Sequence, residues 1–373
     1  MNKLMTQFAA IITLTALLFS LSGCSKSKDP LDDLAKANES TWISEDAAYT
    51  DLIAEITDYC SSHNVKGSFM IANDEQVIYA AGMNSKDING DTVTPYTTYR
   101  IASLTKQFTA ACILQQVEKG ELSLDDTLQP FFPDYPYAVD ITIYDLLHMR
   151  SGIADYVNES SVFFGNATDE ELDMIFSDKI TEETILEYLY EAELIFTPGS
   201  KMQYSNTNYF LLALILEQVS GSSYDDYMQK NIFNVCDMEN TTCLGDDDLT
   251  SIPDNGIDYT MQQTSTIGSK GSGDINSSVI DMLKWNRALM GQKLLNSEML
   301  ELMFDTEDYY GCGWVQLQDD NYYHTGSSLG YESVNALLRG NQESNLYVVL
   351  LFPSRNNEYN VDSLLKICMD YLQ

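Results

Sequence analysis

Ser103-Leu104-Thr105-Lys106 follows Tyr99-Arg100-Ile101-Ala102 and opens a helical run that we expect to end near Gly120. Residues three apart on a helix are neighbours, at about 5–6 Å between Cβ atoms. Lys106 is therefore expected beside the Ser103 hydroxyl, at the helix end where free backbone N–H groups favour negative charge. A desolvated amine in that place can activate the serine as a nucleophile. A capping serine near a solvated lysine would give the same spacing, so this motif alone is weak.

The second motif is Tyr204-Ser205-Asn206, after Pro198-Gly199 and before an apolar helix. A tyrosine on a loop packed against a buried helix can present its phenol to the serine and move a proton. Asn206 can donate a hydrogen bond to a substrate carbonyl. The alternative is an ordinary turn followed by a helix start.

The third motif is His324-Thr325-Gly326 on a predicted strand, followed by Ser327. A glycine at this position lets a substrate backbone lie close to the strand, and the three residues are expected to contact the substrate. The backbone N–H of Ser327 can pair with that of Ser103 as an oxyanion hole. A structural histidine on a half-exposed strand is the alternative.

Strand-like runs lie near both ends of the chain, and helical patterns fill most of the region between them. The runs are residues 67–72, 76–81, 313–318, 322–325, 333–339 and 346–352. This order predicts an α+β fold with one antiparallel sheet of about five or more strands from both termini, flanked by helices. A mostly helical subdomain, residues 103–280, is inserted between the sheet segments 44–102 and 281–373.

Taken in this order, on a helix start, a loop and a strand, the three motifs are far more specific together than singly. The chain resembles the penicillin-recognising serine hydrolases, which include class C β-lactamases, D-alanyl-D-alanine carboxypeptidases and related esterases. The resemblance spans roughly residues 45–373 and includes residues 146–153, 231–238, 271–274 and 284–285. It implies a β-lactamase/transpeptidase-like fold and a serine hydrolase domain over residues 44–373.

The resemblance also implies a ping-pong acyl transfer without a cofactor. Ser103 would attack an amide, ester or lactam carbonyl, and Lys106 and Tyr204 would share the proton transfers. Which of the two acts as the base stays open. The implied partner is a small peptide, ester or lactam, such as a peptidoglycan stem peptide. A non-hydrolytic surface receptor that uses the same cleft for binding or slow acylation is the rival interpretation.

His324 stands where many β-lactamases of this family have a lysine that binds the substrate carboxylate. Histidine has an unperturbed pKa near 6.5 and is mostly neutral at pH 7. Residues 204–206 and 324–326 look more like the carboxypeptidase and esterase branches. Efficient β-lactamase activity is therefore less expected than carboxypeptidase or esterase activity.

Residues 1–23 are predicted to be a lipoprotein signal peptide, with a basic start and an apolar stretch too short for a comfortable membrane span. Leu21-Ser22-Gly23-Cys24 resembles a lipobox, so Cys24 is expected to carry the lipid. A plain secretory signal is the alternative. Residues 24–43 are expected to be a flexible tether. The protein would then lie outside the cytoplasm, held at the membrane by its lipid anchor alone.

The composition excludes several functions. The chain has 373 residues, with 20 basic and 56 acidic side chains and a formal net charge of −36. So acidic a surface repels phosphate backbones, which argues against a nucleic-acid partner. The three histidines lie far apart, so no metal site is expected. Disulfide pairing stays open, although Cys236 and Cys243 could close a short loop, and so does the oligomeric state.

Overall fold

The structure is a computed structural model. It describes residues 41–159, 181–243, 249–252, 267–328, 330–339, 345–353 and 361–372. The predicted signal peptide, Cys24 and most of the predicted tether lie outside these residues. Within them, no helix has the length and apolar character that crossing a membrane requires.

The predicted tether, residues 24–43, is wrong for its last three residues. Thr41–Ile43 form strand β1, which pairs antiparallel with β3 (Val77–Met83). Aromatic and β-branched side chains such as those of Trp42 and Ile43 favour strands, but only the neighbouring strand decides that this short segment becomes one. Residues 41–43 therefore do not belong to a tether, and the tether stays a prediction for the residues before them.

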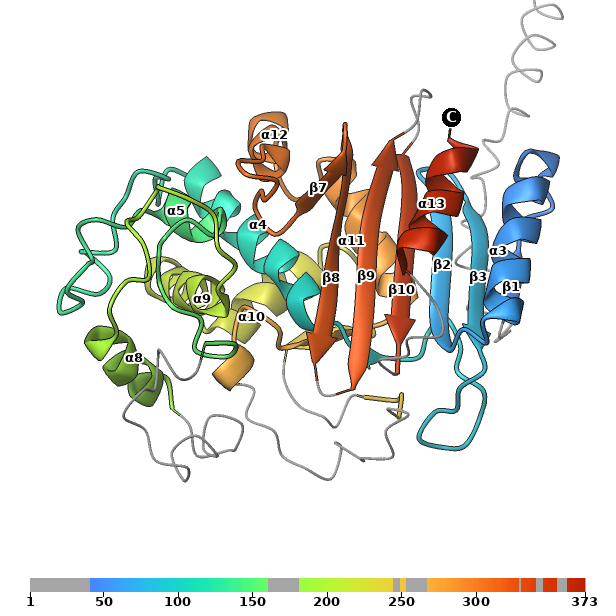
Figure 1. Cartoon of the computed structure of the whole chain (residues 1–373), viewed down its shortest axis with the longest axis horizontal. Helices are drawn as coiled ribbons and strands as arrows, with labels where there is room; N and C mark the ends of the chain where they lie inside the picture. The colour runs from blue at the N-terminus through green and yellow to red at the C-terminus, as the bar shows by residue number, and fades with distance from the viewer. Residues whose placement is uncertain are drawn as a thin grey trace, which may run out of the picture. The chain divides into compact units, whose positions relative to one another are not determined.

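A seven-stranded antiparallel sheet forms the centre of the described fold, in the order β1-β3-β2-β10-β9-β8-β7 (Figure 1). Its remaining strands are β2 (Gly67–Asn73), β10 (Asn345–Phe352), β9 (Tyr331–Arg339), β8 (Asn321–Ser328) and β7 (Val315–Gln318). The central pair joins β2 from the first part of the chain to β10 from the last part. The predicted α+β class, with one sheet built from both ends of the chain, is confirmed.

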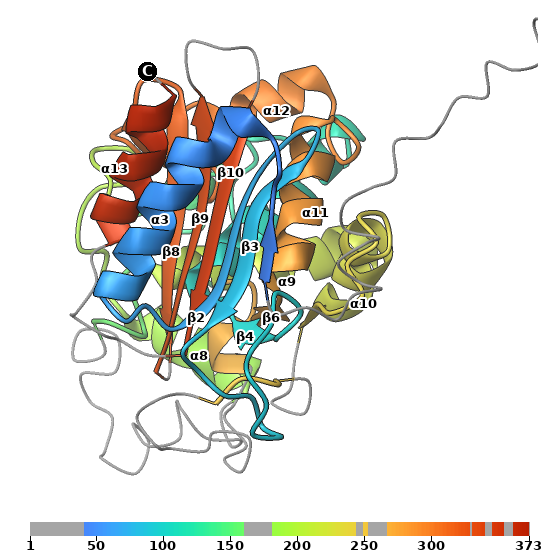
Figure 2. The same cartoon turned by 90° about the vertical axis from the view of Figure 1, so that its right-hand side faces the viewer.

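Helices cover both faces of this sheet (Figure 2). Helices α3 (Thr50–Ser62) and α13 (Val361–Tyr371) lie side by side on one face, and α11 (Val279–Met290) packs against β2 and β10 on the other. Alternate residues of a strand point to opposite faces. Phe69 and Leu350 accordingly belong to the apolar core under α3 and α13, whereas Asn335 on the opposite face hydrogen-bonds Asn286 of α11.

The helical region is centred on α4 (Thr105–Glu118) and α9 (Asn206–Ser220), which pack against each other and are almost wholly buried. Around them lie α5 (Ile143–Leu147), α8 (Glu182–Glu191), α10 (Tyr224–Met228) and α12 (Ser297–Phe304). The six cysteines of the described region are buried free thiols. The short disulfide loop between Cys236 and Cys243 is therefore absent.

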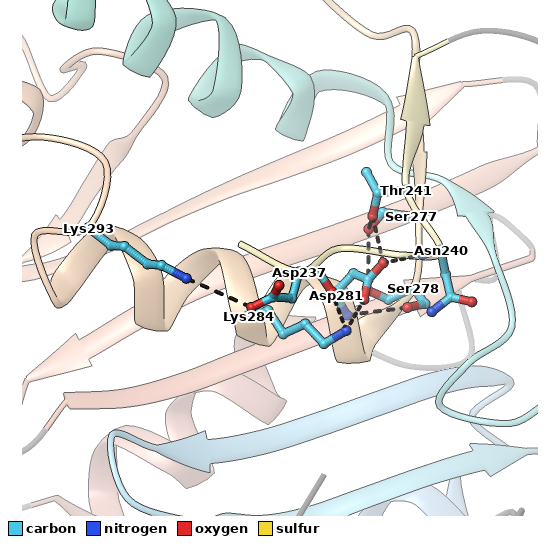
Figure 3. A network of polar contacts seen from close by, with 8 residues as sticks. All are labelled: Asp237, Asn240, Thr241, Ser277, Ser278, Asp281, Lys284 and Lys293. Carbon is cyan, nitrogen blue, oxygen red and sulfur yellow. Dashed lines mark hydrogen bonds and ion pairs between the residues drawn. The ribbon is translucent and has the colours of Figure 1, made fainter. Parts of the chain in front are cut away.

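A small second sheet, ordered β4-β6-β5, leads into the first motif. Its strands are β4 (Tyr99–Arg100), β6 (Ile275–Ser277) and β5 (Thr242–Cys243). Figure 3 shows the polar network that holds it at the start of α11. The buried carboxylate of Asp281 accepts hydrogen bonds from the Asn240 backbone, 2.6 Å, and the Thr241 hydroxyl, 3.0 Å. Because Thr241 also contacts Ser277, the register partner of Tyr99, the network anchors the strand that precedes the first motif.

Candidate active site

The first motif lies where β4 passes into α4. Ser103 belongs to a short 3₁₀ turn, η2 (Ala102–Leu104), and Lys106 lies in the first turn of α4. Lys106 Nζ is 3.2 Å from Ser103 Oγ, as the spacing of three residues predicts. Ala102 has a φ of +47°, a left-handed conformation that costs a non-glycine residue roughly 1–2 kcal/mol. Strain of this kind is found at functional sites, where the surrounding structure holds it in place.

Lys106 is fully buried, and its amine has two further partners. Nζ lies 2.8 Å from Asn206 Oδ1 and 2.7 Å from the backbone oxygen of Ser272. Burial lowers the pKa of Lys106 to about 7, against the opposing pull of the Asp155 and Asp274 carboxylates. A large share of Lys106 is therefore an uncharged amine at neutral pH.

Tyr204 of the second motif completes the contacts of the Ser103 hydroxyl. Its phenol donates to Ser103 Oγ at 2.9 Å, and its ring centroid lies 4.9 Å from Lys106 Nζ. Burial raises the pKa of the Tyr204 phenol well above its ordinary value, although the hydrogen bond to Ser103 acts in the opposite direction. The phenol is therefore protonated at neutral pH.

Asn206 begins α9 and has a structural task that the sequence did not reveal. Its Oδ1 accepts from Lys106, and its Nδ2 donates to Asp155 Oδ2 at 2.9 Å. Asn206 thereby connects the lysine to a buried carboxylate. The predicted hydrogen bond to a substrate carbonyl stays a prediction, for which one amide N–H remains.

The third motif lies against the first. A Cβ atom on Gly326 would be 2.3 Å from the Ile101 oxygen and 3.0 Å from the Ser103 nitrogen. The protein's own backbone, and not only a substrate, thus requires glycine here. Thr325 and Ser327 are exposed. The Ser103 nitrogen lies beside Gly326, the residue before Ser327 on β8. The oxyanion hole formed by the Ser103 and Ser327 N–H groups stays a prediction.

His324 is buried, with 4% of its surface exposed. Its Nδ1 lies 2.6 Å from the Thr325 oxygen, and its Nε2 lies 3.2 Å from the hydroxyl of Tyr310. Burial, followed by the charge of Lys106, lowers the pKa of His324 to about 3. The ring is therefore neutral, and both nitrogens already have partners. Binding of a substrate carboxylate, which the family's lysine performs at this position, does not fit this geometry for His324.

Arg150, within the segment 146–153, ties together two loops of the site. Its guanidinium contacts Asp308 Oδ2 at 2.6 Å, Glu307 Oε1 at 3.3 Å, and the backbone oxygen of Gly199. One loop continues to Tyr204 and the other to Tyr310. Because all these contacts converge on one buried planar cation, the two loops are held at a fixed separation.

Sequence reasoning missed three contributors, namely Asp155, Ser272 and Tyr310. Ser272 acts through its backbone oxygen, which no side-chain pattern reveals, although it lies in the glycine-rich segment 271–274. Asp155 and Tyr310 belong to none of the three motifs, and no spacing rule connects them to Ser103. Their contacts arise only when distant segments pack together.

The antiparallel sheet, the inserted helices and the serine–lysine–tyrosine contact define a serine hydrolase of the penicillin-recognising type. A family model described as Beta-lactamase matches residues 48–364. The chain belongs to the β-lactamase family.

Similar proteins agree with this placement. "Penicillin-binding protein 4*" of Bacillus subtilis (strain 168) is 28% identical over 269 residues, which are 63% of this chain and 57% of the relative. The chain thus spans just over half the length of that relative. A penicillin-binding protein from Bacillus halodurans superposes with a TM-score of 0.71 at 24% identity, covering 84% of this chain and 99% of the other. D-amino acid amidase from Ochrobactrum anthropi SV3, complexed with L-phenylalanine, superposes with a TM-score of 0.69 at 22% identity, covering 86% of this chain and 98% of the other. These two likenesses concern the fold.

Proposed function

We propose that the protein hydrolyses D-alanyl peptides, or related amides and esters, through a covalent acyl-enzyme on Ser103. The proposal includes anchoring outside the cytoplasm by a lipid on Cys24, where a peptidoglycan stem peptide would be within reach. The observation that carries the catalytic part is the pair of contacts at the Ser103 hydroxyl, 3.2 Å from Lys106 Nζ and 2.9 Å from the Tyr204 phenol.

Hydrogen-bond directions favour Lys106 as the base for acylation. A neutral amine has two N–H groups and one lone pair. Asn206 Oδ1 and the Ser272 oxygen are both acceptors, so they take the two N–H groups. The lone pair is then left for the Ser103 hydroxyl, whose proton it can accept as Oγ attacks the carbonyl carbon.

Tyr204 suits the second proton transfer. Its phenol is protonated and already points at Ser103 Oγ, so it can give its proton to the leaving amine or alkoxide. The proton that Lys106 took from the serine then restores the Tyr204 phenol. The N–H groups of Ser103 and Ser327 would stabilise the oxyanion of the tetrahedral intermediate. Water then attacks the acyl ester and releases the acid, which regenerates the Ser103 hydroxyl.

Three observations favour the amide and ester branches over efficient β-lactam hydrolysis. The position of the family's cationic lysine holds His324, which is neutral and fully engaged. The structurally similar D-amino acid amidase acts, by its name, on amides. The formal net charge of −36 would further repel anionic β-lactams at low salt.

A substrate panel with intact-mass detection tests the proposal. D-alanyl peptides, D-amino acid amides, short esters and a cephalosporin are each incubated with the protein, and both the product and the adduct are measured. We expect turnover of amides or esters with a transient adduct that Ser103→Ala lacks. A long-lived adduct without turnover of any substrate would instead favour the receptor interpretation, and no adduct with any compound would contradict acyl-enzyme chemistry.

A further inference from the structure

Asp155 is buried, and its carboxylate accepts three hydrogen bonds. Its Oδ1 accepts from the backbone N–H of Val157 at 2.9 Å. Its Oδ2 accepts from the side-chain amides of Asn158 at 2.7 Å and Asn206 at 2.9 Å. An ionised carboxylate can only accept, and a buried one needs such donors. The end of the Asn206 amide that faces Asp155 must therefore be its nitrogen.

The backbone beside Asp155 is fixed against the start of α9. The hydroxyl of Thr207 donates to the Ala154 oxygen at 2.7 Å and accepts from the Tyr156 N–H at 3.2 Å. The residues on both sides of Asp155 are thus bonded to the residue that follows Asn206. Because all five residues are buried, Asp155 and Asn206 are held opposite each other.

The direction of the Asn206 amide decides what the amine of Lys106 can do. With Nδ2 facing Asp155, Oδ1 faces Lys106 Nζ at 2.8 Å and accepts one of its N–H groups. The lone pair of the neutral amine then stays available to the Ser103 hydroxyl, 3.2 Å away. With the amide turned round, Nδ2 would donate to that lone pair and compete with Ser103. The turned amide would also place two acceptors against each other at Asp155, so the carboxylate disfavours it.

The charge of Asp155 has a second effect on Lys106. Burial lowers the pKa of Lys106 to about 7, and the carboxylates of Asp155 and then Asp274 oppose this fall. Burial also raises the pKa of Asp274 to about 7, so that carboxyl is only partly charged at neutral pH. Burial keeps three further groups near the amine uncharged, since it raises the pKa of the phenols and lowers that of the imidazole: Tyr204, Tyr209 and His324.

We infer that Asp155 is a positioning residue, which holds the Asn206 amide with its oxygen towards Lys106 and so leaves the lone pair of the amine for the reacting hydroxyl. Asp155 acts through Asn206 and through its charge, and not on the substrate itself. The consequence for catalysis rests on the proposed function, whereas the effect of Asp155 on Lys106 does not.

The effect on Lys106 is tested by NMR titration of protein labelled with ¹³C at the lysine ε-carbons, in which Lys106→Met identifies the signal. We expect a midpoint at about pH 7 in the wild type. The midpoint should be lower in Asp155→Asn, because a neutral amide no longer favours the charged amine. Asp281→Asn makes the same change at another buried carboxylate and should leave the midpoint in place. An unmoved midpoint in Asp155→Asn would overturn the inference.

The amide orientation is tested by exchanging the two side chains. At about pH 8, Asp155→Asn should lower kcat/KM on a neutral ester about tenfold, because an amide at position 155 can face Asn206 with either end. Asn206→Asp alone places two carboxylates against each other and should cost more. Adding Asp155→Asn to Asn206→Asp restores one donor facing one acceptor, so the double variant should be about tenfold more active than Asn206→Asp.

A purely structural role would make Asp155→Asn harmful in both backgrounds. A double variant no more active than Asn206→Asp would therefore overturn the inference. In Asp155→Asn the rising limb of the kcat/KM profile should also lie at lower pH than in the wild type, and an unmoved limb would contradict the role. Thermal unfolding shows whether each variant is folded. If no substrate of the panel were turned over, the proposed function would fail, and the NMR titration of Asp155→Asn would still decide whether Asp155 acts on Lys106.

Discussion

Lys106→Met is expected to lower kcat/KM by about 10³-fold on any substrate that the protein turns over, the usual contribution of a positioned general base. Methionine is of similar length and fits a fully buried position, so the fold should be retained. What the variant lacks is the lone pair that the two carbonyl acceptors leave for Ser103. Steady-state kinetics and thermal unfolding of the two proteins provide the comparison.

The pH dependence of kcat/KM is a second test of the role of Lys106. The pKa of Lys106 is about 7, so below that pH the neutral fraction falls about tenfold per unit. Wild-type kcat/KM on a neutral ester should therefore rise with pH up to about 7 and then level off, and the residual activity of Lys106→Met should lack this limb. Lys119→Met, at the other end of α4, is the matched control. Activity of Lys106→Met within tenfold of wild type, or a flat wild-type profile, would exclude Lys106 as the base.

Gly326→Ala is expected to lower both activity and stability strongly, although it adds only one methyl group. The new Cβ would lie 2.3 Å from both the Ile101 oxygen and Ser333 Oγ, and 3.0 Å from the Ser103 nitrogen. Strand β8 must then move away from the segment that carries Ser103. Overpacking of this kind costs about 1–3 kcal/mol of stability. A displacement of about 1 Å at a reacting group can cost on the order of 10²-fold in rate.

Gly273→Ala is the control for this prediction. Its Cβ would lie 3.6 Å from the nearest atom, which belongs to Ala102, so it adds the same methyl near the same segment in ordinary van der Waals contact. We expect nearly normal activity and unfolding temperature for Gly273→Ala. If Gly326→Ala behaved equally well, the close contact between β8 and the Ser103 segment would not be needed for activity.

The sequence predicted correctly those features that depend only on residues close together in the chain. Helix geometry alone places Lys106 beside Ser103, and the strand-like runs 67–72, 76–81, 333–339 and 346–352 predict the central strands. The short strand Thr41–Ile43 was missed because its pairing with β3, and not its composition, makes it a strand. Segments of this length have no periodicity to read.

The rest of the site depends on long-range packing. Tyr204 and Ser103 are far apart in the chain, so their contact was predicted from the family resemblance and not from spacing. No motif or spacing rule pointed to Asp155, Tyr310 or the Ser272 oxygen. A backbone acceptor or a buried side chain has no sequence pattern that distinguishes a place in the site from a place elsewhere in the fold. For His324, the sequence indicated a mostly neutral ring, and the structure adds the burial and the two hydrogen bonds that explain why.

The central claim is that Ser103 is the nucleophile. Its most direct test is treatment with a fluorophosphonate, followed by intact-mass analysis and peptide mapping of the labelled protein. We predict a single adduct on Ser103, absent from Ser103→Ala and much slower to form in Lys106→Met. An adduct on another residue, or labelling that persists in Ser103→Ala, would contradict the account.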